Sequence, residues 1–189
     1  MADSDLDTLF QGKRFAEAEA LLRRQLDSTP DDAAARYNLS LALARQGRLP
    51  EAFEDLLPLL RSQPVESHVL NAGAKLLLAL RRPAEAVPLA KLLAQRHPDA
   101  LDAKLHLALA LRLAGKLSKA ERAAREALRL EPKSAAAMAE LAFTLLARGQ
   151  RDEAAQLLKR SLELSPGNEV RQRALADLLM KGGRPAEAL

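Results

Sequence analysis

The side chains that could carry catalysis are few in this chain of 189 residues. Asp102 and His106 are four residues apart, so they share one face of a helix, and His68 lies 34 residues before Asp102. Two histidines and a carboxylate can form a metal site. No further ligand is evident, and an Asp–His pair without a metal is the better interpretation.

Other catalytic machinery is missing from the sequence. The chain has no cysteine, which excludes thiolate catalysis, cysteine-ligated zinc and disulfides. It has no glycine-rich phosphate loop, no nucleophile elbow and no zinc-binding helix motif. The sequence therefore predicts a protein that is not an enzyme, with no catalytic residue, no metal and no cofactor.

What organises the chain is an internal repeat of 34 residues. Three series show this spacing without a gap: a proline series (Pro30, Pro64, Pro98, Pro132, Pro166), an alanine series (Ala18, Ala52, Ala86, Ala120, Ala154, Ala188) and a leucine series (Leu9, Leu43, Leu77, Leu111, Leu145, Leu179). A less complete glycine series has Gly47, Gly115, Gly149 and Gly183. Such regular spacing over the whole chain indicates stacked structural repeats.

Composition makes these repeats helical. The chain holds 41 leucines and 38 alanines but no isoleucine, and only 3% of its residues are aromatic, so it is all-α rather than a sheet protein. Each repeat shows two helical segments, the first ending near the glycine and the second ending before the proline. Candidate N-caps follow the prolines: Asp31 or Asp32, Ser67, Asp99, Ser134 and Asn168.

The pattern resembles the tetratricopeptide repeat family. The segment Tyr37-Asn38-Leu39, followed by Arg45-Gln46-Gly47-Arg48-Leu49-Pro50-Glu51-Ala52, is closest to the family sequence. The family tryptophan is absent, and Lys13 and Arg81 replace the turn glycine in repeats 1 and 3. With Gly12 one residue earlier, we expect the turn of repeat 1 to be shifted.

The resemblance implies a right-handed α-solenoid of antiparallel helix pairs that forms one domain over residues 1–189. We expect five full repeats and a partial sixth: 1–32, 33–66, 67–100, 101–134, 135–168 and 169–189. The last repeat reaches Leu189 just after its second helix begins. We therefore expect further sequence beyond Leu189. In the alternative interpretation, residues 169–182 cap the stack of repeats and the remaining tail is frayed.

The resemblance also implies a binding groove lined by the first helix of each repeat, chiefly at its second, fifth, sixth, ninth, twelfth and thirteenth positions. The predicted groove residues are Tyr37, Asn38, Leu41, Arg45, His68, Asn71, Lys75, Leu105, His106, Leu109, Arg112, Phe143 and Leu146. Asparagine side chains can fix a peptide backbone, and leucines provide apolar pockets. In the alternative interpretation, several of the leucines only pack the repeat interfaces. An anion held by Lys75, His106 and Arg112 is a further hypothesis.

Three functional hypotheses follow. The leading one is a non-catalytic scaffold that binds a peptide or protein segment in the groove. The second is the N-terminal interaction region of a longer bacterial enzyme, a transferase or hydroxylase. The third is self-assembly into a homo-oligomer.

Charge is unevenly distributed, although the net value is only +4. Residues 1–66 carry −4 and residues 67–134 carry +7, but acidic residues interrupt the basic segment, which has no aromatic residues for stacking on bases. We therefore expect no nucleic-acid partner. The acidic start is not a signal peptide, and no apolar segment is long enough for a membrane span, so we expect a cytoplasmic protein.

Overall fold

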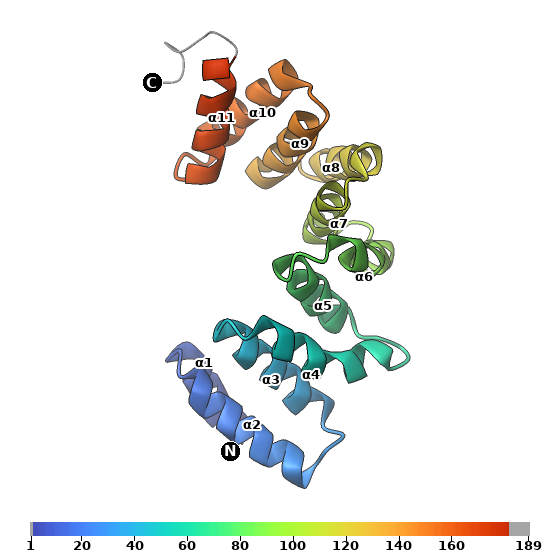
Figure 1. Ribbon diagram of the computed structural model, residues 1–189, viewed down its shortest axis with the longest axis vertical. Helices are drawn as coiled ribbons and strands as arrows, with labels where there is room; N and C mark the ends of the chain where they lie inside the picture. The colour runs from blue at the N-terminus through green and yellow to red at the C-terminus, as the bar shows by residue number, and fades with distance from the viewer. Residues whose placement is uncertain (1, 182–189) are drawn as a thin grey trace. The chain divides into compact units, whose positions relative to one another are not determined.

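The computed structural model describes the backbone of residues 2–181 and the side chains of residues 5–180. This part of the chain forms eleven α-helices and no strand, so the all-α prediction is confirmed (Figure 1). The helices are α1 (Ala2–Gln11), α2 (Phe15–Ser28), α3 (Ala33–Arg45), α4 (Leu49–Arg61), α5 (Ser67–Ala79), α6 (Pro83–Arg96), α7 (Leu101–Leu113), α8 (Leu117–Leu130), α9 (Ala135–Ala147), α10 (Arg151–Leu164) and α11 (Glu169–Lys181). Gly183, Ala188 and the expected second helix of repeat 6 lie outside the described residues.

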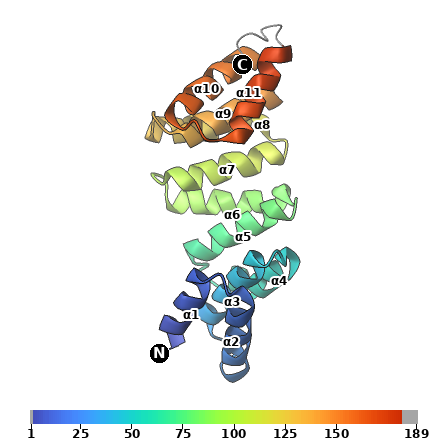
Figure 2. The ribbon, with the colours of Figure 1, turned by 90° about the vertical axis from the view of Figure 1, so that its left-hand side faces the viewer.

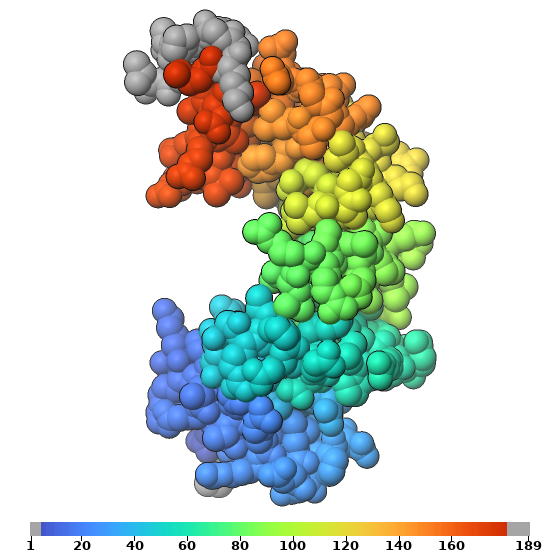
Figure 3. Space-filling view, viewed as in Figure 1, coloured from blue at the N-terminus to red at the C-terminus, as the bar shows by residue number. Residues whose placement is uncertain are grey.

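The chain divides into two compact units, which we call the N-terminal unit (Met1–Leu89) and the C-terminal unit (Ala90–Leu189). In the N-terminal unit, α2 contacts both α1 and α3, and α4 packs between α3 and α5 (Figures 1 and 2). In the C-terminal unit, α10 packs against α9 and against α11. These three helices form the orange to red part of Figure 3. The expectation of one domain over residues 1–189 stays a prediction.

The turn between the two helices of a repeat uses one residue with a positive φ. Gly47, Gly115 and Gly149 hold this position at φ of 73–80°, a region that glycine enters at little cost. Lys13 and Arg81 adopt the same conformation, at φ of 56° and 60°. The turn of repeat 1 is therefore not shifted toward Gly12, and that expectation is wrong.

The helix starts agree only in part with the predicted N-caps. Asp32, Ser134 and Asn168 each accept a hydrogen bond from a backbone N–H three residues later, at 2.9, 3.3 and 3.0 Å. The backbone hydrogen bond from Ala35 lowers the pKa of Asp32. The predictions for Ser67 and Asp99 are wrong, because Glu66 and Ala100 occupy the cap positions of α5 and α7 without a side-chain cap.

The core follows the alanine and leucine series. The side chains of the alanine series from Ala18 to Ala154 are fully buried, which lets the two helices of a repeat pack closely. Buried hydroxyls tie helices together as well: Ser40 donates to the carbonyl of Ala52 at 2.7 Å, and Ser161 donates to the carbonyl of Ala135 at 2.7 Å.

An acidic residue on a second helix joins one repeat to the next. Glu19 of α2 accepts hydrogen bonds from Gln46 at 2.9 Å and from Arg48 at 2.7 Å, and both donors belong to repeat 2. Glu121 of α8 takes the same position in repeat 4 and pairs with Arg148 of repeat 5. The Glu19 carboxylate therefore links two consecutive repeats inside the N-terminal unit, and the Glu121 carboxylate does so inside the C-terminal unit.

Candidate functional site

The thirteen predicted groove residues lie on four first helices, and none of them is in the buried core. Tyr37, Asn38, Leu41 and Arg45 are on α3, and His68, Asn71 and Lys75 are on α5, all in the N-terminal unit. Leu105, His106, Leu109 and Arg112 are on α7, and Phe143 and Leu146 are on α9, all in the C-terminal unit. The four leucines of this set keep part of their surface exposed, whereas Leu39 and Leu43 of the core do not.

A ring contact connects the two helices of the N-terminal set. The rings of Tyr37 and His68 meet edge to face, with centroids 4.6 Å apart and an angle of 85° between their planes. Burial raises the pKa of Tyr37. On α5, Oδ1 of Asn71 is buried and accepts no hydrogen bond from the described residues. Lys75, one turn further along, is exposed. These side chains offer hydrogen bonds, an aromatic ring and a positive charge on one pair of helices.

An ion pair connects the two helices of the C-terminal set. Nε of Arg112 donates to Oε1 of Glu140 at 2.7 Å, and the two side chains are only 20% and 12% exposed. The Arg112 guanidinium also lies 5.5 Å from the centre of the Phe143 ring. Burial raises the pKa of Glu140, and Arg112 opposes this shift.

This ion pair bears on the anion hypothesis. Glu140 already neutralises the charge of the Arg112 guanidinium, so an anion at Arg112 would compete with Glu140. Lys75 belongs to the N-terminal unit, whereas His106 and Arg112 belong to the C-terminal unit. The anion hypothesis stays a prediction that the structure does not support.

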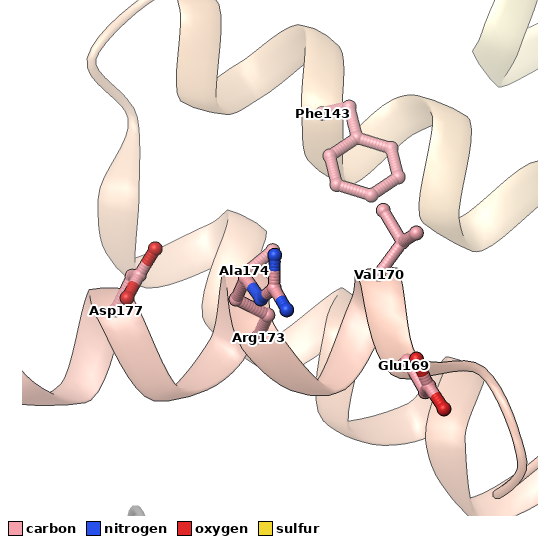
Figure 4. Close-up of a pocket in the computed structure, with 6 residues that line it drawn as sticks. All are labelled: Phe143, Glu169, Val170, Arg173, Ala174 and Asp177. Atoms are coloured by element: carbon pink, nitrogen blue, oxygen red, sulfur yellow. The ribbon is translucent and has the colours of Figure 1, made fainter.

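A pocket of about 270 Å³ extends the C-terminal set onto α11 (Figure 4). It is lined by Phe143 of α9 and by Glu169, Val170, Arg173, Ala174 and Asp177 of α11. Val170 is 67% exposed, and Figure 4 shows its side chain beside the Phe143 ring. Val170 and Ala174 were not among the predicted residues. They hold the second and sixth positions of repeat 6, which are groove positions, so the repeat pattern used for the other groove residues could have predicted both.

The metal site considered for His68, Asp102 and His106 has no counterpart among the described residues. Across the described residues, no three His, Cys, Asp or Glu side chains are grouped closely enough to hold a metal ion. None of the described helices combines the length and the apolar character that crossing a membrane requires.

Comparison with known families identifies the repeat. One tetratricopeptide repeat family model matches residues 7–66 and 71–124, and a second matches residues 111–160 and 145–189. The chain belongs to the tetratricopeptide repeat family. Its members are generally protein-interaction scaffolds and typically non-catalytic. No curated protein matches the chain by sequence.

Solved structures share the fold. A tetratricopeptide repeat protein from Parabacteroides merdae aligns with a TM-score of 0.85 and 22% identity, over 99% of this chain and 74% of that protein. MamA from Desulfovibrio magneticus aligns with a TM-score of 0.80 and 20% identity, over 89% and 95% of the two chains. YrrB, described as a protein with an unusual peptide-binding site, aligns with a TM-score of 0.77 and 18% identity, over 89% and 87%. At these identities the likeness establishes the helical-repeat fold alone, which confirms the expected fold class.

Proposed function

We propose that this protein is a non-catalytic, cytoplasmic scaffold that binds a peptide or protein segment along the first helices of its repeats. The observation that carries this proposal is the placement of the thirteen groove residues. All of them lie on first helices, and none is taken up by the core. Family membership supports the proposal, and YrrB shows that a protein of this fold can hold a peptide.

The two sets of groove residues suit different parts of a bound chain. Asn38 and Asn71 carry amides, which can donate to and accept from a peptide backbone, and Lys75 adds an exposed positive charge. The C-terminal set presents Leu105, Leu109, Phe143 and Leu146, which suit apolar side chains, because its one arginine is neutralised by Glu140. We therefore expect polar recognition in the N-terminal unit and apolar recognition in the C-terminal unit.

Peptide selection followed by mutation tests the proposal. We expect a library of displayed peptides to yield binders whose affinity falls at least about tenfold in the double variant Asn38→Ala, Lys75→Ala, because two polar anchors are lost. Circular dichroism should show an unchanged fold, since neither side chain belongs to the core. The control variant Arg61→Ala, Lys91→Ala removes exposed cations from second helices and should bind normally. Equal affinity of the double variant and the parent protein would count against the proposal.

Self-association is the second candidate function. Val170 and Met180 on α11 are 67% and 61% exposed, the highest values among the large apolar side chains that the structure describes. If they form a contact between copies, light scattering should show a molar mass that rises with protein concentration, and Val170→Ser, Met180→Ser should abolish that rise. A monomer mass at every concentration would remove this candidate.

A further inference from the structure

A second pocket lies at the turn between α1 and α2, within the N-terminal unit. It is lined by Phe10, Gln11, Lys13, Phe15 and Arg45, and its volume is about 340 Å³. Four of these residues come from one short stretch of chain, and Arg45 comes from the last turn of α3. Of the five, only Arg45 belongs to the predicted groove set.

The two cations of this pocket differ from the cations around them. Arg14 pairs with Glu17, Arg23 pairs with Glu19, and Arg48 pairs with both Glu19 and Glu51.

These pairs occupy the carboxylates of Glu17, Glu19 and Glu51. Lys13 and Arg45 are both exposed, and neither forms an ion pair with any residue that the structure describes. None of the acidic side chains that the structure describes lines the pocket. The pocket therefore presents two uncompensated positive charges, which favours an anionic ligand group.

The rest of the pocket is aromatic and amide in character. The rings of Phe10 and Phe15 meet edge to face with centroids 5.8 Å apart, and both side chains remain half-buried. Such a pair offers an apolar wall to a large side chain. Gln11 is exposed, and its amide can both donate a hydrogen bond and accept one. A peptide unit inside a chain needs both, whereas a chain-terminal carboxylate only accepts.

We propose that this pocket binds an internal acidic residue of a partner peptide next to a large apolar residue. The carboxylate would lie between Lys13 and Arg45, and the apolar side chain would lie against Phe10 and Phe15. This inference rests on the proposed function, because it assigns the chemistry of one part of the bound segment. It gives the N-terminal unit a sequence preference that the predicted groove residues alone do not define.

Defined peptides test this assignment on the full chain. The probe is acetylated and amidated Ac-Gly-Ser-Phe-Glu-Ser-Gly-NH2, titrated into the isotope-labelled protein at low salt and followed by NMR. We expect shifts in the amides of the five lining residues, and binding roughly three- to fivefold weaker when glutamine replaces the glutamate of the probe.

Protein variants make the test specific. Lys13→Gln and Arg45→Gln should each weaken binding of the glutamate probe by roughly three- to fivefold. Arg81→Gln is the matched control for Lys13, since Arg81 has the same positive-φ turn position in repeat 3 but does not line the pocket. Arg61→Gln is the control for Arg45, because it removes an exposed arginine from the last turn of another helix.

The outcomes separate this inference from the proposed function. Equal binding of the glutamate and glutamine probes, or equal effects of the Lys13 and Arg81 variants, would overturn the pocket assignment. Tighter binding of a probe ending in a free carboxylate would overturn it in favour of a chain end. In either case, library peptides that still depend on Asn38 and Lys75 would leave the proposed function intact.

Discussion

Lys13 and Arg81 adopt a backbone conformation with positive φ, which glycine enters far more easily than lysine or arginine. Both close the turn between two helices with a positive φ, as Gly47, Gly115 and Gly149 do. A side chain in this region meets the backbone and costs roughly 1–2 kcal/mol. Backbone hydrogen bonds hold the geometry: the backbone N–H of Arg14 donates to the carbonyl of Leu9 at 2.8 Å, and the backbone N–H of Arg48 donates to the carbonyl of Leu43 at 3.0 Å.

Glycine at these two positions should stabilise the protein. We expect Lys13→Gly and Arg81→Gly each to raise the free energy of unfolding by about 1 kcal/mol, because the strain of the left-handed conformation disappears. Urea denaturation measures the change. The control is the opposite exchange, Gly149→Ala, which should lower the free energy of unfolding by a similar amount. A loss of stability in both glycine variants would show that the turns do not carry this strain.

The residue-level predictions failed where a local pattern had more than one solution. Sequence spacing left Asp31 or Asp32 open as the N-cap of α3, and the structure selects Asp32. It was right for Ser134 and Asn168, but α5 and α7 begin without a side-chain cap, after Glu66 and Ala100. Arg112 was predicted as a groove cation. Its partner Glu140 lies on the first helix of the next repeat. Sequence spacing alone does not predict that these two side chains form an ion pair.

At the scale of the helices, the carboxylate of Glu19 is a connecting element. It is only 14% exposed and receives hydrogen bonds from its own helix and from the turn that follows α3. Burial opposes its ionisation, but the hydrogen bonds from Gln46, Arg48 and Arg23 prevail and lower its pKa from 4.5 to about 2. The folded state therefore favours the charged form.

This shift gives a pH-dependent contribution to stability. A carboxylate with a lowered pKa stabilises the fold above the unfolded-state pKa, and this stabilisation is lost as pH falls from about 4.5 toward 2. We expect Glu19→Gln to lower the free energy of unfolding by about 1–2 kcal/mol at pH 7 and by less than half of that at pH 3. Denaturant titrations at the two pH values measure the difference.

Glu17 provides the matched control for Glu19. It lies on the same helix and pairs only with Arg14, and both side chains are more than half exposed. Glu17→Gln should therefore leave the free energy of unfolding nearly unchanged at either pH, because solvent screens an exposed ion pair. Equal effects of the Glu17 and Glu19 variants would show that the connection between repeats adds nothing.

Within each compact unit, the described helices contact chiefly their neighbours in sequence. The helix α4 packs between α3 and α5, and α10 packs between α9 and α11. Stability in such a protein is a sum of repeats and of the interfaces between neighbours. A defect in one compact unit should therefore leave local protection in the other unit largely unchanged.

Leu56 and Leu158 allow a symmetric test of this locality. Both are fully buried at the same position of a second helix, one in each compact unit. Removing either side chain to alanine should cost about 2–5 kcal/mol. In native-state hydrogen exchange, Leu56→Ala should expose amides of α3 to α5, and Leu158→Ala should expose those of α9 to α11. Equal loss of protection in both units from either variant would contradict the local model.

Sequence periodicity predicted the helical repeats more completely than it predicted the residues that line the two pockets. Leucine and alanine at fixed spacing determine the helices and their pairing, because burial acts on every repeat alike. Phe10 and Arg45 both fall on groove positions of the repeat, but the pocket that they line also needs Lys13, which has a turn conformation that its residue type disfavours. Val170 and Ala174 were within reach of the repeat register, as their positions in α11 show.

The ring contact between Tyr37 and His68 has a practical consequence for following a ligand. The chain contains one tyrosine and no tryptophan. Its intrinsic fluorescence therefore comes almost entirely from a single ring on the proposed binding face, packed against the next first helix. A segment bound beside α3 and α5 would change the surroundings of that ring directly. The unmodified protein thus carries its own optical reporter, placed where a partner would bind.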